Sequence, residues 1–376
     1  MPLHIVIITS SYPSSREPWA SSFVQKLARD LIKLGIKTTV IAPVRIWRWK
    51  DTGHYSVQAE RNEPAVMRPP YLSCSSKMIP GVGSTFLLTI RNFYAAARKA
   101  ILKLPTSPSH IYGQFLFPPG YVAAQLARET SSKSVVDLGE SFFDRYERQL
   151  GVDKIQRTLN AMDFIVSVAD HLKDRCINSY AIPGRKILTA RNAHSFEFNP
   201  LEKSEARQRL NLPPDRPIIG FVGAFDANKR PLFVLDALKG RPDIGVFFLG
   251  RPGVQKPRGE QVLFAGSVPY DEVHIWLSAA DVFVHTSLIE MSSNALAEAR
   301  ACGLPIIATD IRGNSEVVDS RYALLVDPWD QRMLSEAIFK LVDNHDLRLQ
   351  MSKAALTAAQ EYTSMDRARS IVSWIT

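Results

Sequence analysis

The sequence has few cysteines, no long apolar run and no secretory leader. Its three cysteines, Cys74, Cys176 and Cys302, are odd in number and far apart in the 376 residues, which excludes a disulfide framework and fits a reducing compartment. No apolar run reaches the about 20 residues that span a bilayer. Residues 3–8 are mostly apolar but follow no basic segment, so we expect a buried strand there and no signal peptide. These absences predict a cytoplasmic protein.

Three short binding motifs are missing as well. No Gly-x-Gly-x-x-Gly follows the first apolar strand of either half of the chain, which argues against a redox enzyme that binds a dinucleotide. No glycine-rich loop ending in Lys-Ser/Thr is present, which argues against a nucleoside triphosphatase. No Asp-x-Asp triplet is present that would hold a metal ion, and we expect no metal site.

Positive charge is concentrated in the first quarter of the chain. Residues 1–100 contain 14 lysines and arginines against 5 acidic residues, and the remaining 276 residues are nearly balanced. Residues 45–50 alternate tryptophans with cations, and residues 91–103 have the pattern of a basic helix. This leaves two interpretations open, a solvated surface and peripheral contact with an anionic membrane. We do not expect nucleic acid as a partner, because no recognisable binding motif accompanies the charge.

Two stretches of alternating strands and helices predict an α/β chain with two doubly wound, Rossmann-like domains facing across a cleft. In the first stretch, strands at 3–9 and 37–43 flank an amphipathic helix at 23–34. The second begins with an apolar strand at 217–223 and includes a helix at 294–301. We expect an N-terminal domain at 1–198, a linker at 199–216, a C-terminal domain at 217–360, and a helix at 361–376 that packs back on the N-terminal domain.

The most informative segment follows the strand at 281–285. Ser292 and Ser293 are natural N-caps for the next helix, whose N-terminus and preceding loop amides would suit a phosphate. Glu290 and Glu298 flank these amides, and carboxylates accept hydrogen bonds from sugar hydroxyls. From their spacing alone, a structural role for both glutamates is a better interpretation than ligand binding. The candidate binding residues here are Glu290, Met291, Ser292, Ser293, Asn294 and Glu298.

A second candidate segment follows the strand at 217–223. The strand runs into Gly223, a loop, and then a helix that starts near Pro231. Lys229 would sit just before that helix and could neutralise a diphosphate, although an ordinary solvated lysine fits this segment better when it is taken alone.

These segments together resemble the family 4 (group 1) glycosyltransferases, which have the GT-B fold. Glu290-x7-Glu298 followed by Ala-Arg-Ala-Cys-Gly-Leu-Pro at 299–305 is similar to the family's donor-site signature, and the similarity extends over nearly the whole chain. The resemblance implies that Glu298 holds the ribose of a nucleotide sugar and that Glu290 and the amides of residues 291–294 hold the sugar. It also implies that Lys229 stabilises the departing diphosphate, with retention of anomeric configuration and without a metal.

The chain departs from the family at three places. Ala224 stands where the family often has an arginine, so we expect Arg230 to supply the missing phosphate contact. The usual glycine pair of the first loop is absent. No histidine occupies the acceptor-side position; Glu140 is the nearest polar candidate for contact with the acceptor, and a structural role fits it equally well.

The resulting expectation is a hexosyltransferase-type enzyme. It would move a sugar from a UDP- or GDP-linked donor to a glycan or lipid-linked acceptor, in the synthesis of a cell-surface polysaccharide such as lipopolysaccharide. The nucleotide sugar is the substrate, so we expect no cofactor. Two alternatives stay open. One is a nucleotide-sugar epimerase, although no acid/base pair for it is visible, and the other is a non-catalytic GT-B module that binds a nucleotide.

Overall fold

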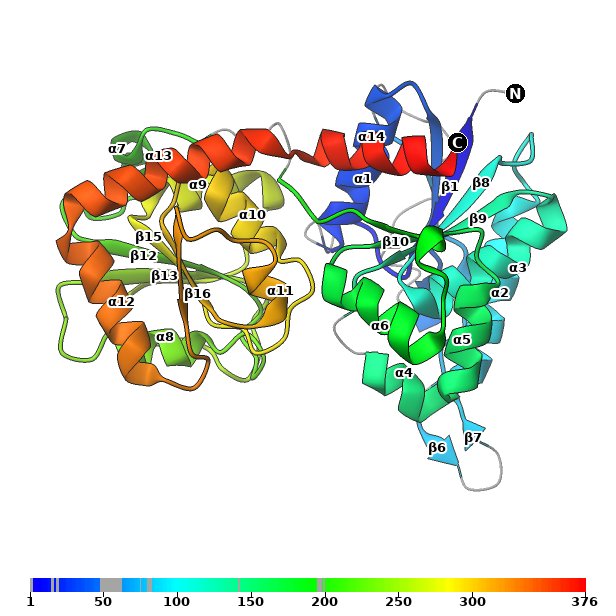
Figure 1. Ribbon diagram of the computed structural model, residues 1–376, viewed down its shortest axis with the longest axis horizontal. Helices are drawn as coiled ribbons and strands as arrows, with labels where there is room; N and C mark the ends of the chain where they lie inside the picture. Colours follow the sequence, from blue (N-terminus) through cyan, green and yellow to red (C-terminus); the bar gives the residue numbers. More distant parts are fainter. Residues whose placement is uncertain are drawn as a thin grey trace. The chain divides into compact units, whose positions relative to one another are not determined.

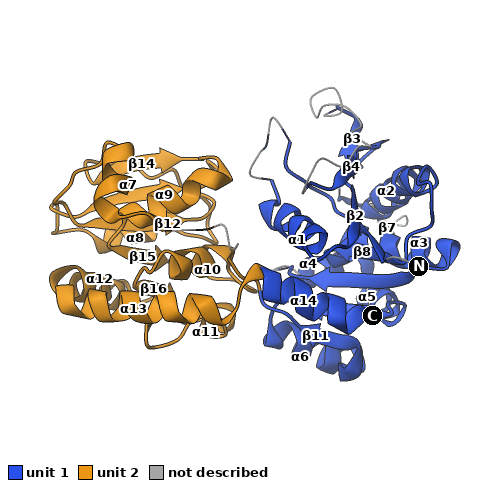
Figure 2. Ribbon diagram, turned by 90° about the horizontal axis from the view of Figure 1, so that it is seen from above, with its two compact units in different colours: residues 1–191, 365–376 blue, residues 192–364 orange. Residues whose placement is uncertain are grey.

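The computed structural model describes residues 3–14, 17, 20–47, 63–74, 76–79, 83–140, 143–194, 198 and 200–376. The chain forms two compact units, which Figure 2 shows in different colours. The first unit contains residues 1–191 and 365–376, and the second contains residues 192–364.

The first unit is built on a parallel sheet that has seven strands within the described residues, in the order β11-β10-β9-β8-β1-β2-β4. The sheet strands are β1 (His4–Ile8), β2 (Lys37–Ile41), β4 (Ala65–Met67), β8 (His110–Gln114), β9 (Lys133–Leu138), β10 (Phe164–Ser167) and β11 (Ile187–Thr189). Short pairs are β3 (Val44–Arg45) with β5 (Pro70–Tyr71), and β6 (Met78–Ile79) with β7 (Gly83–Ser84). The helices are α1 (Ser22–Lys33), α2 (Phe86–Ile101), α3 (Tyr121–Thr130), α4 (Phe143–Leu150), α5 (Val152–Asn160), α6 (Asp170–Tyr180) and, at the C-terminus, α14 (Ser364–Ile375), with single turns η2 (Leu116–Gly120) and η3 (Gly184–Lys186).

Alternating side chains of β1 divide the core of this unit into two layers. Ile5 and Ile7 pack with α1 and α14 on one face, and Val6 and Ile8 pack with α2 and α3 on the other. This period of two is what a strand buried on both faces requires. The C-terminal helix is therefore part of the core of the first unit.

The second unit repeats the architecture with six parallel strands among its described residues, in the order β14-β13-β12-β15-β16-β17. The strands are β12 (Ile218–Val222), β13 (Gly245–Leu249), β14 (Val262–Gly266), β15 (Val282–His285), β16 (Ile306–Thr309) and β17 (Ala323–Val326). The helices are α7 (Lys203–Arg209), α8 (Pro231–Ala237), α9 (Val273–Ala279), α10 (Asn294–Ala301), α11 (Arg312–Ser315), α12 (Gln331–Asp343) and α13 (His345–Glu361), with a 3-10 turn η4 (Tyr270–Glu272). Helices α9, α10 and α13 cover one face, and α8 and α12 cover the other (Figure 1).

The segment expected to be a linker is structured. Helix α7 lies within residues 199–216 and belongs to the second unit. Asp281 holds it there, since its carboxylate accepts hydrogen bonds from Lys203 (2.6 Å), from Arg207 (2.7 Å) and from the backbone N–H of Ile218 (2.8 Å). The division between the units falls at residues 191 and 192, earlier than expected.

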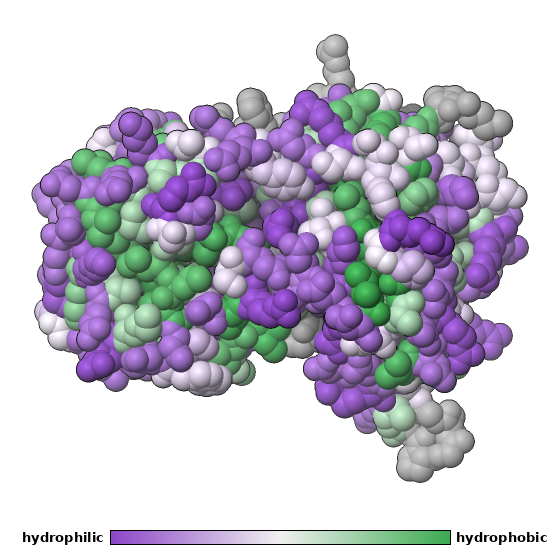
Figure 3. All heavy atoms as spheres, viewed as in Figure 1, coloured by the Kyte–Doolittle hydropathy of each residue, from purple (hydrophilic) through white to green (hydrophobic). Residues whose placement is uncertain are grey.

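Neither a membrane-spanning helix nor a metal-binding cluster is found in the described part of the chain. No described helix combines the length and apolar character needed to cross a bilayer. Among the same residues, no group of three or more His, Cys, Asp or Glu side chains is placed to hold a metal ion. Apolar side chains remain visible between hydrophilic ones over both units (Figure 3), as is usual for a folded surface.

Candidate functional site

The strand order of the second unit defines where a ligand would bind. From β12 the chain proceeds to β13 on one side, whereas β15 pairs with the other side of β12. In parallel sheets of this kind ligands bind at the carboxyl ends of the strands, where the order reverses. The loops that follow β12 and β15 are therefore the expected ligand-binding loops, and they contain Lys229 and Glu290.

Backbone and side-chain hydrogen bonds join these two loops. Asn228 accepts from the N–H groups of Leu288 and Ile289 (both 2.9 Å) and donates to the Ile289 carbonyl (3.1 Å). The Thr286 hydroxyl donates to the carbonyl of Lys229 (2.8 Å). This pairing fixes the position of Lys229 relative to Glu290.

The Glu290 carboxylate is the centre of a polar cluster. Its Oε1 accepts from the Lys229 ammonium, from His285 Nε2 (2.9 Å) and from the Ser287 hydroxyl (3.0 Å). Burial alone would raise the pKa of Glu290, but the His285 hydrogen bond and the Lys229 charge outweigh it and lower that pKa to about 2. Glu290 is therefore an anion at every pH of interest. Burial lowers the pKa of His285, which favours a neutral imidazole.

The start of α10 presents backbone donors without protein partners. The Ser293 hydroxyl accepts from the Leu296 N–H (3.4 Å) and acts as the N-cap, as expected. Ser292 instead receives the Asn192 N–H at its hydroxyl (3.0 Å) and the Asn192 amide at its carbonyl (2.9 Å). Among the described residues, no acceptor takes the N–H groups of residues 291–294. This is the environment that favours an anion.

Glu298 lies in α10 and is almost fully buried, with 5% of its surface exposed. Its Oε1 accepts from the Tyr270 hydroxyl at 3.0 Å. The tyrosine belongs to the turn after β14, so it fixes the carboxylate from a different loop of the same unit. Tyr270 could not be recognised from the sequence, because only the fold brings residues 270 and 298 together.

Arg230, expected to contact phosphate, is held by contacts within the second unit. Its guanidinium donates to the carbonyls of Thr286 (3.0 Å) and Pro328 (2.6 Å) and lies over the rings of Phe233 and Trp329. These contacts give Arg230 a structural role, tying α8 to the loop after β17. A phosphate contact from Arg230 stays a prediction, since adjacency to Lys229 in sequence does not fix the direction of the side chain.

Three glycines at the carboxyl edge allow close approach of loops. A Cβ at Gly223 would lie 3.3 Å from Lys229 Cγ, so Gly223 leaves room for that lysine. A Cβ at Gly250 would lie 1.9 Å from the Gly223 carbonyl oxygen, and one at Gly313 would lie 2.0 Å from the Glu290 carbonyl oxygen. Gly250 and Gly313 were not predicted; Gly250 directly follows β13, which was the available signal, whereas Gly313 lies in α11, four residues after the end of β16.

Glu140 lies in the first unit, just beyond the carboxyl end of β9. Its carboxylate accepts from the backbone N–H groups of Leu116 and Gly139 and is 9% exposed. Burial raises the pKa of Glu140 to about 7, although the two backbone donors act in the opposite direction. The same residue thus supports the loop after β8 and titrates near neutrality.

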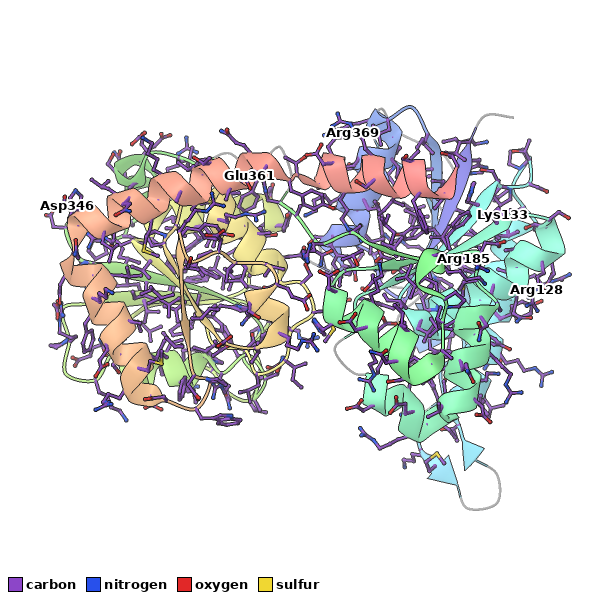
Figure 4. All side chains as sticks on the ribbon, viewed as in Figure 1. Arg128, Lys133, Arg185, Asp346, Glu361 and Arg369 are labelled. Atoms are coloured by element: carbon purple, nitrogen blue, oxygen red, sulfur yellow. The ribbon has the colours of Figure 1, made fainter. Side chains whose placement is uncertain are left out.

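The first unit also has a pocket of about 380 Å³ at the opposite, amino ends of its strands. Arg128 and Lys133, both labelled in Figure 4, contribute to its lining. The Lys133 ammonium pairs with Asp163 (3.2 Å), which also accepts from the Ser134 N–H (2.9 Å). The pocket contains none of the residues singled out from the sequence.

Part of the segments named from the sequence lies outside the described residues. These are residues 48–50 of the segment at 45–50 and residue 199 of the expected linker.

Residues 202–357 match the profile of the family described as "Glycosyl transferases group 1". A protein of Bacillus subtilis (strain 168) named as a teichuronic acid biosynthesis glycosyltransferase, TuaC, is 28% identical over 352 residues, which cover 89% of this chain and 88% of that protein. Residues 202–357 of the second unit therefore form a group 1 glycosyltransferase domain, and this domain together with the curated relative supports a transferase enzyme.

Two solved structures share the fold. Sucrose-phosphate synthase from Thermosynechococcus elongatus superposes with a TM-score of 0.79 at 18% identity, over 99% of this chain and 98% of that one. Anabaena HepE in complex with UDP and glucose superposes with a TM-score of 0.75 at 15% sequence identity, over 100% of this chain and 99% of that one. The fold is therefore GT-B, as expected from the sequence.

Proposed function

We propose that this protein is a retaining, metal-independent glycosyltransferase that transfers a sugar from a UDP- or GDP-linked donor to a glycan or lipid-linked acceptor in the synthesis of a cell-surface polysaccharide. The observation that carries the proposal is the convergence of Lys229, Glu290 and the unpartnered amides of residues 291–294 at the carboxyl edge of the second unit. The anionic donor and its sugar hydroxyls need this combination of cation, N–H donors and carboxylate.

The chemistry required of the protein is stabilisation of the negative charge that develops on the departing diphosphate. The N-terminus of α10 is fixed before the reaction and the Lys229 side chain is only 23% exposed, which makes their electrostatic effect larger than in water. Glu290 would bind sugar hydroxyls and Glu298 the ribose. Retention, independence of metals and absence of a cofactor are proposed from the resemblance of the Glu290-x7-Glu298 motif.

The polysaccharide role is supported by the name of the Bacillus relative, and a UDP-linked donor by the ligands of the HepE structure. The proposed location is the cytoplasm, which the three free cysteines support. Curated relatives carry transferase names, which supports transfer over epimerisation. Incorporation of labelled sugar into a membrane fraction tests the acceptor class.

Donor binding can be tested with a thermal-shift panel of UDP, GDP and ADP and their sugars. A ligand at ~100 times its dissociation constant stabilises the fold by about 2.7 kcal/mol. We expect Lys229→Ala and Glu298→Ala each to weaken nucleotide-sugar binding or turnover by about tenfold or more. Lys239→Ala is a matched control, because the Lys239 side chain, in the turn just after α8, is 79% exposed and pairs with Asp236 near the end of that helix. Wild-type kinetics in both site variants would refute the site.

Contact with an anionic membrane is proposed for the exposed face of α2. That face carries Leu87 and Leu88 (44% and 51% exposed), and the cations Arg91 and Lys99 are exposed along the same helix. Apolar side chains beside cations match an anionic headgroup layer.

Sedimentation with anionic liposomes tests this surface. We expect salt-sensitive binding of the wild type and a clear loss in the double variant Arg91→Glu/Lys99→Glu. Lys353→Glu, a charge reversal at an exposed position of α13, serves as the control. No binding of the wild type at low salt, or equal loss in the control, would remove the membrane contact.

A further inference from the structure

The donors around Glu290 all converge on one of its two oxygens. Lys229, His285 Nε2 and the Ser287 hydroxyl each meet Oε1, and no described residue donates to Oε2. The Glu290 side chain is 10% exposed. Its Oε2, to which no described residue donates, is not fully buried. One oxygen is thus anchored within the protein and the other is accessible.

His285 is suited to be a permanent anchor. It ends β15 and is 1% exposed, and its Nε2 lies within hydrogen-bond distance of both Glu290 Oε1 (2.9 Å) and the Ser287 hydroxyl (3.1 Å). A carboxylate only accepts hydrogen bonds, so the proton of the neutral ring belongs on Nε2. Nδ1 is buried and meets no donor or acceptor, which disfavours a second proton there, in agreement with the lowered pKa of His285.

Ser287 is equally fixed. It is fully buried, and its carbonyl accepts from the Thr309 hydroxyl (2.5 Å) at the end of β16. The anchor therefore rests on two adjacent core strands, β15 and β16, which makes it more rigid than the loop that carries Glu290.

We propose that His285 and Ser287 are positioning residues that hold Glu290 by Oε1 so that Oε2 faces the sugar of the donor. This inference rests on the proposed function and deepens it. Lys229 shares Oε1 in the free protein, but a bound diphosphate competes for its ammonium. His285 and Ser287 keep the carboxylate in place when Lys229 turns to the diphosphate, so sugar recognition does not depend on the lysine.

The test compares a nucleotide sugar with the free nucleotide. Calorimetry with UDP-glucose against UDP, and GDP-mannose against GDP, gives the increment in affinity due to the sugar. We expect His285→Leu, which removes the donor at similar volume, to reduce that increment by about tenfold or more, with nucleotide affinity unchanged. His285→Gln places an N–H where Nε2 lies and is expected to restore it. His345→Leu, at an exposed position of α13, is the control.

The outcomes separate the two proposals. A wild type that binds none of the four ligands overturns the proposed function and this inference with it. A wild type that prefers the nucleotide sugar, with the same preference in His285→Leu, overturns the inference alone. If His285→Leu lowers the affinity for the nucleotide sugar and for the free nucleotide equally, His285 has a structural role only, and the inference is overturned as well. If His285→Leu fails to fold, Ser287→Ala carries the same comparison, with the same expected loss of the sugar increment.

Discussion

Glu140 makes the stability of the first unit depend on pH in an unusual direction. Burial raises its pKa from the ordinary 4.5 to about 7. Below about pH 4.5 the carboxyl is protonated in both the folded and the unfolded chain, so it has no effect. Between 4.5 and 7 the folded state binds the proton that the unfolded state releases, so stability falls as pH rises. Above pH 7 the folded state carries the full free-energy cost of the buried charged carboxylate. That cost is about 3 kcal/mol for a pKa difference of roughly 2.5 between the folded and unfolded states.

Glu140→Gln removes this titration and keeps an oxygen that can accept from the Leu116 N–H. We expect the variant to gain stability over the wild type with increasing pH, by about 3 kcal/mol between pH 4.5 and 8. Urea titrations followed by pulsed hydrogen exchange at the amides of β9 measure the free energy of unfolding of this unit. The amides of β13, in the other unit, are the internal control. Glu147→Gln should behave differently, because the Tyr180 hydrogen bond lowers the pKa of Glu147 below its ordinary 4.5. Its difference from the wild type should stay constant between pH 4.5 and 8 and change, with the opposite sign, only below pH 4.5. A constant difference between Glu140→Gln and the wild type from pH 5 to 8 would refute the reasoning.

Arg367→Leu should destabilise the first unit by about 3–5 kcal/mol, because it leaves the Asp137 carboxylate (1% exposed, 2.7 Å from Arg367) buried without its cation. Arg369→Leu, one half-turn further along α14 and labelled in Figure 4, breaks only an exposed pair and should cost about 1 kcal/mol or less in the same urea titration. Gly313→Ala should weaken UDP-glucose binding, because its Cβ would lie 2.0 Å from the Glu290 carbonyl oxygen and displace that loop; unchanged calorimetric affinity would contradict this.

The elements that could be predicted are those with strong local signals. The apolar strand at 281–285, the serine N-cap and the glycine stop of α10 each act within a few residues, and β15 and α10 lie within one residue of their expected bounds. Helix α7 escaped prediction because prolines on its C-terminal side suggested a loop. What holds it is Asp281, more than 70 residues away in sequence.

In the candidate site, too, the residues with a signal in the sequence could be predicted and the residues without one could not. Lys229, Glu290 and Glu298 stood out through spacing and resemblance, but the groups that orient them did not. Tyr270 could not be found because its partner Glu298 is 28 residues away and only the fold brings them together. His285 and Ser287 lie within five residues of Glu290, but no recognisable motif marks them as its donors.

In the candidate site of the second unit, the groups that anchor Glu290 and the groups proposed to bind the diphosphate belong to different parts of the fold. The anchoring groups belong to strands or their immediate ends, where both faces of the sheet are packed, while Lys229 and the amides before α10 are on loops that hydrogen bonds join to each other. On the proposed function, a ligand that draws the lysine toward its diphosphate can therefore rearrange the loops without displacing Glu290, the carboxylate proposed to bind the sugar. Recognition of the sugar and stabilisation of the leaving group are then separable properties, and substitutions at β15 and at the β12 loop should affect different ligands.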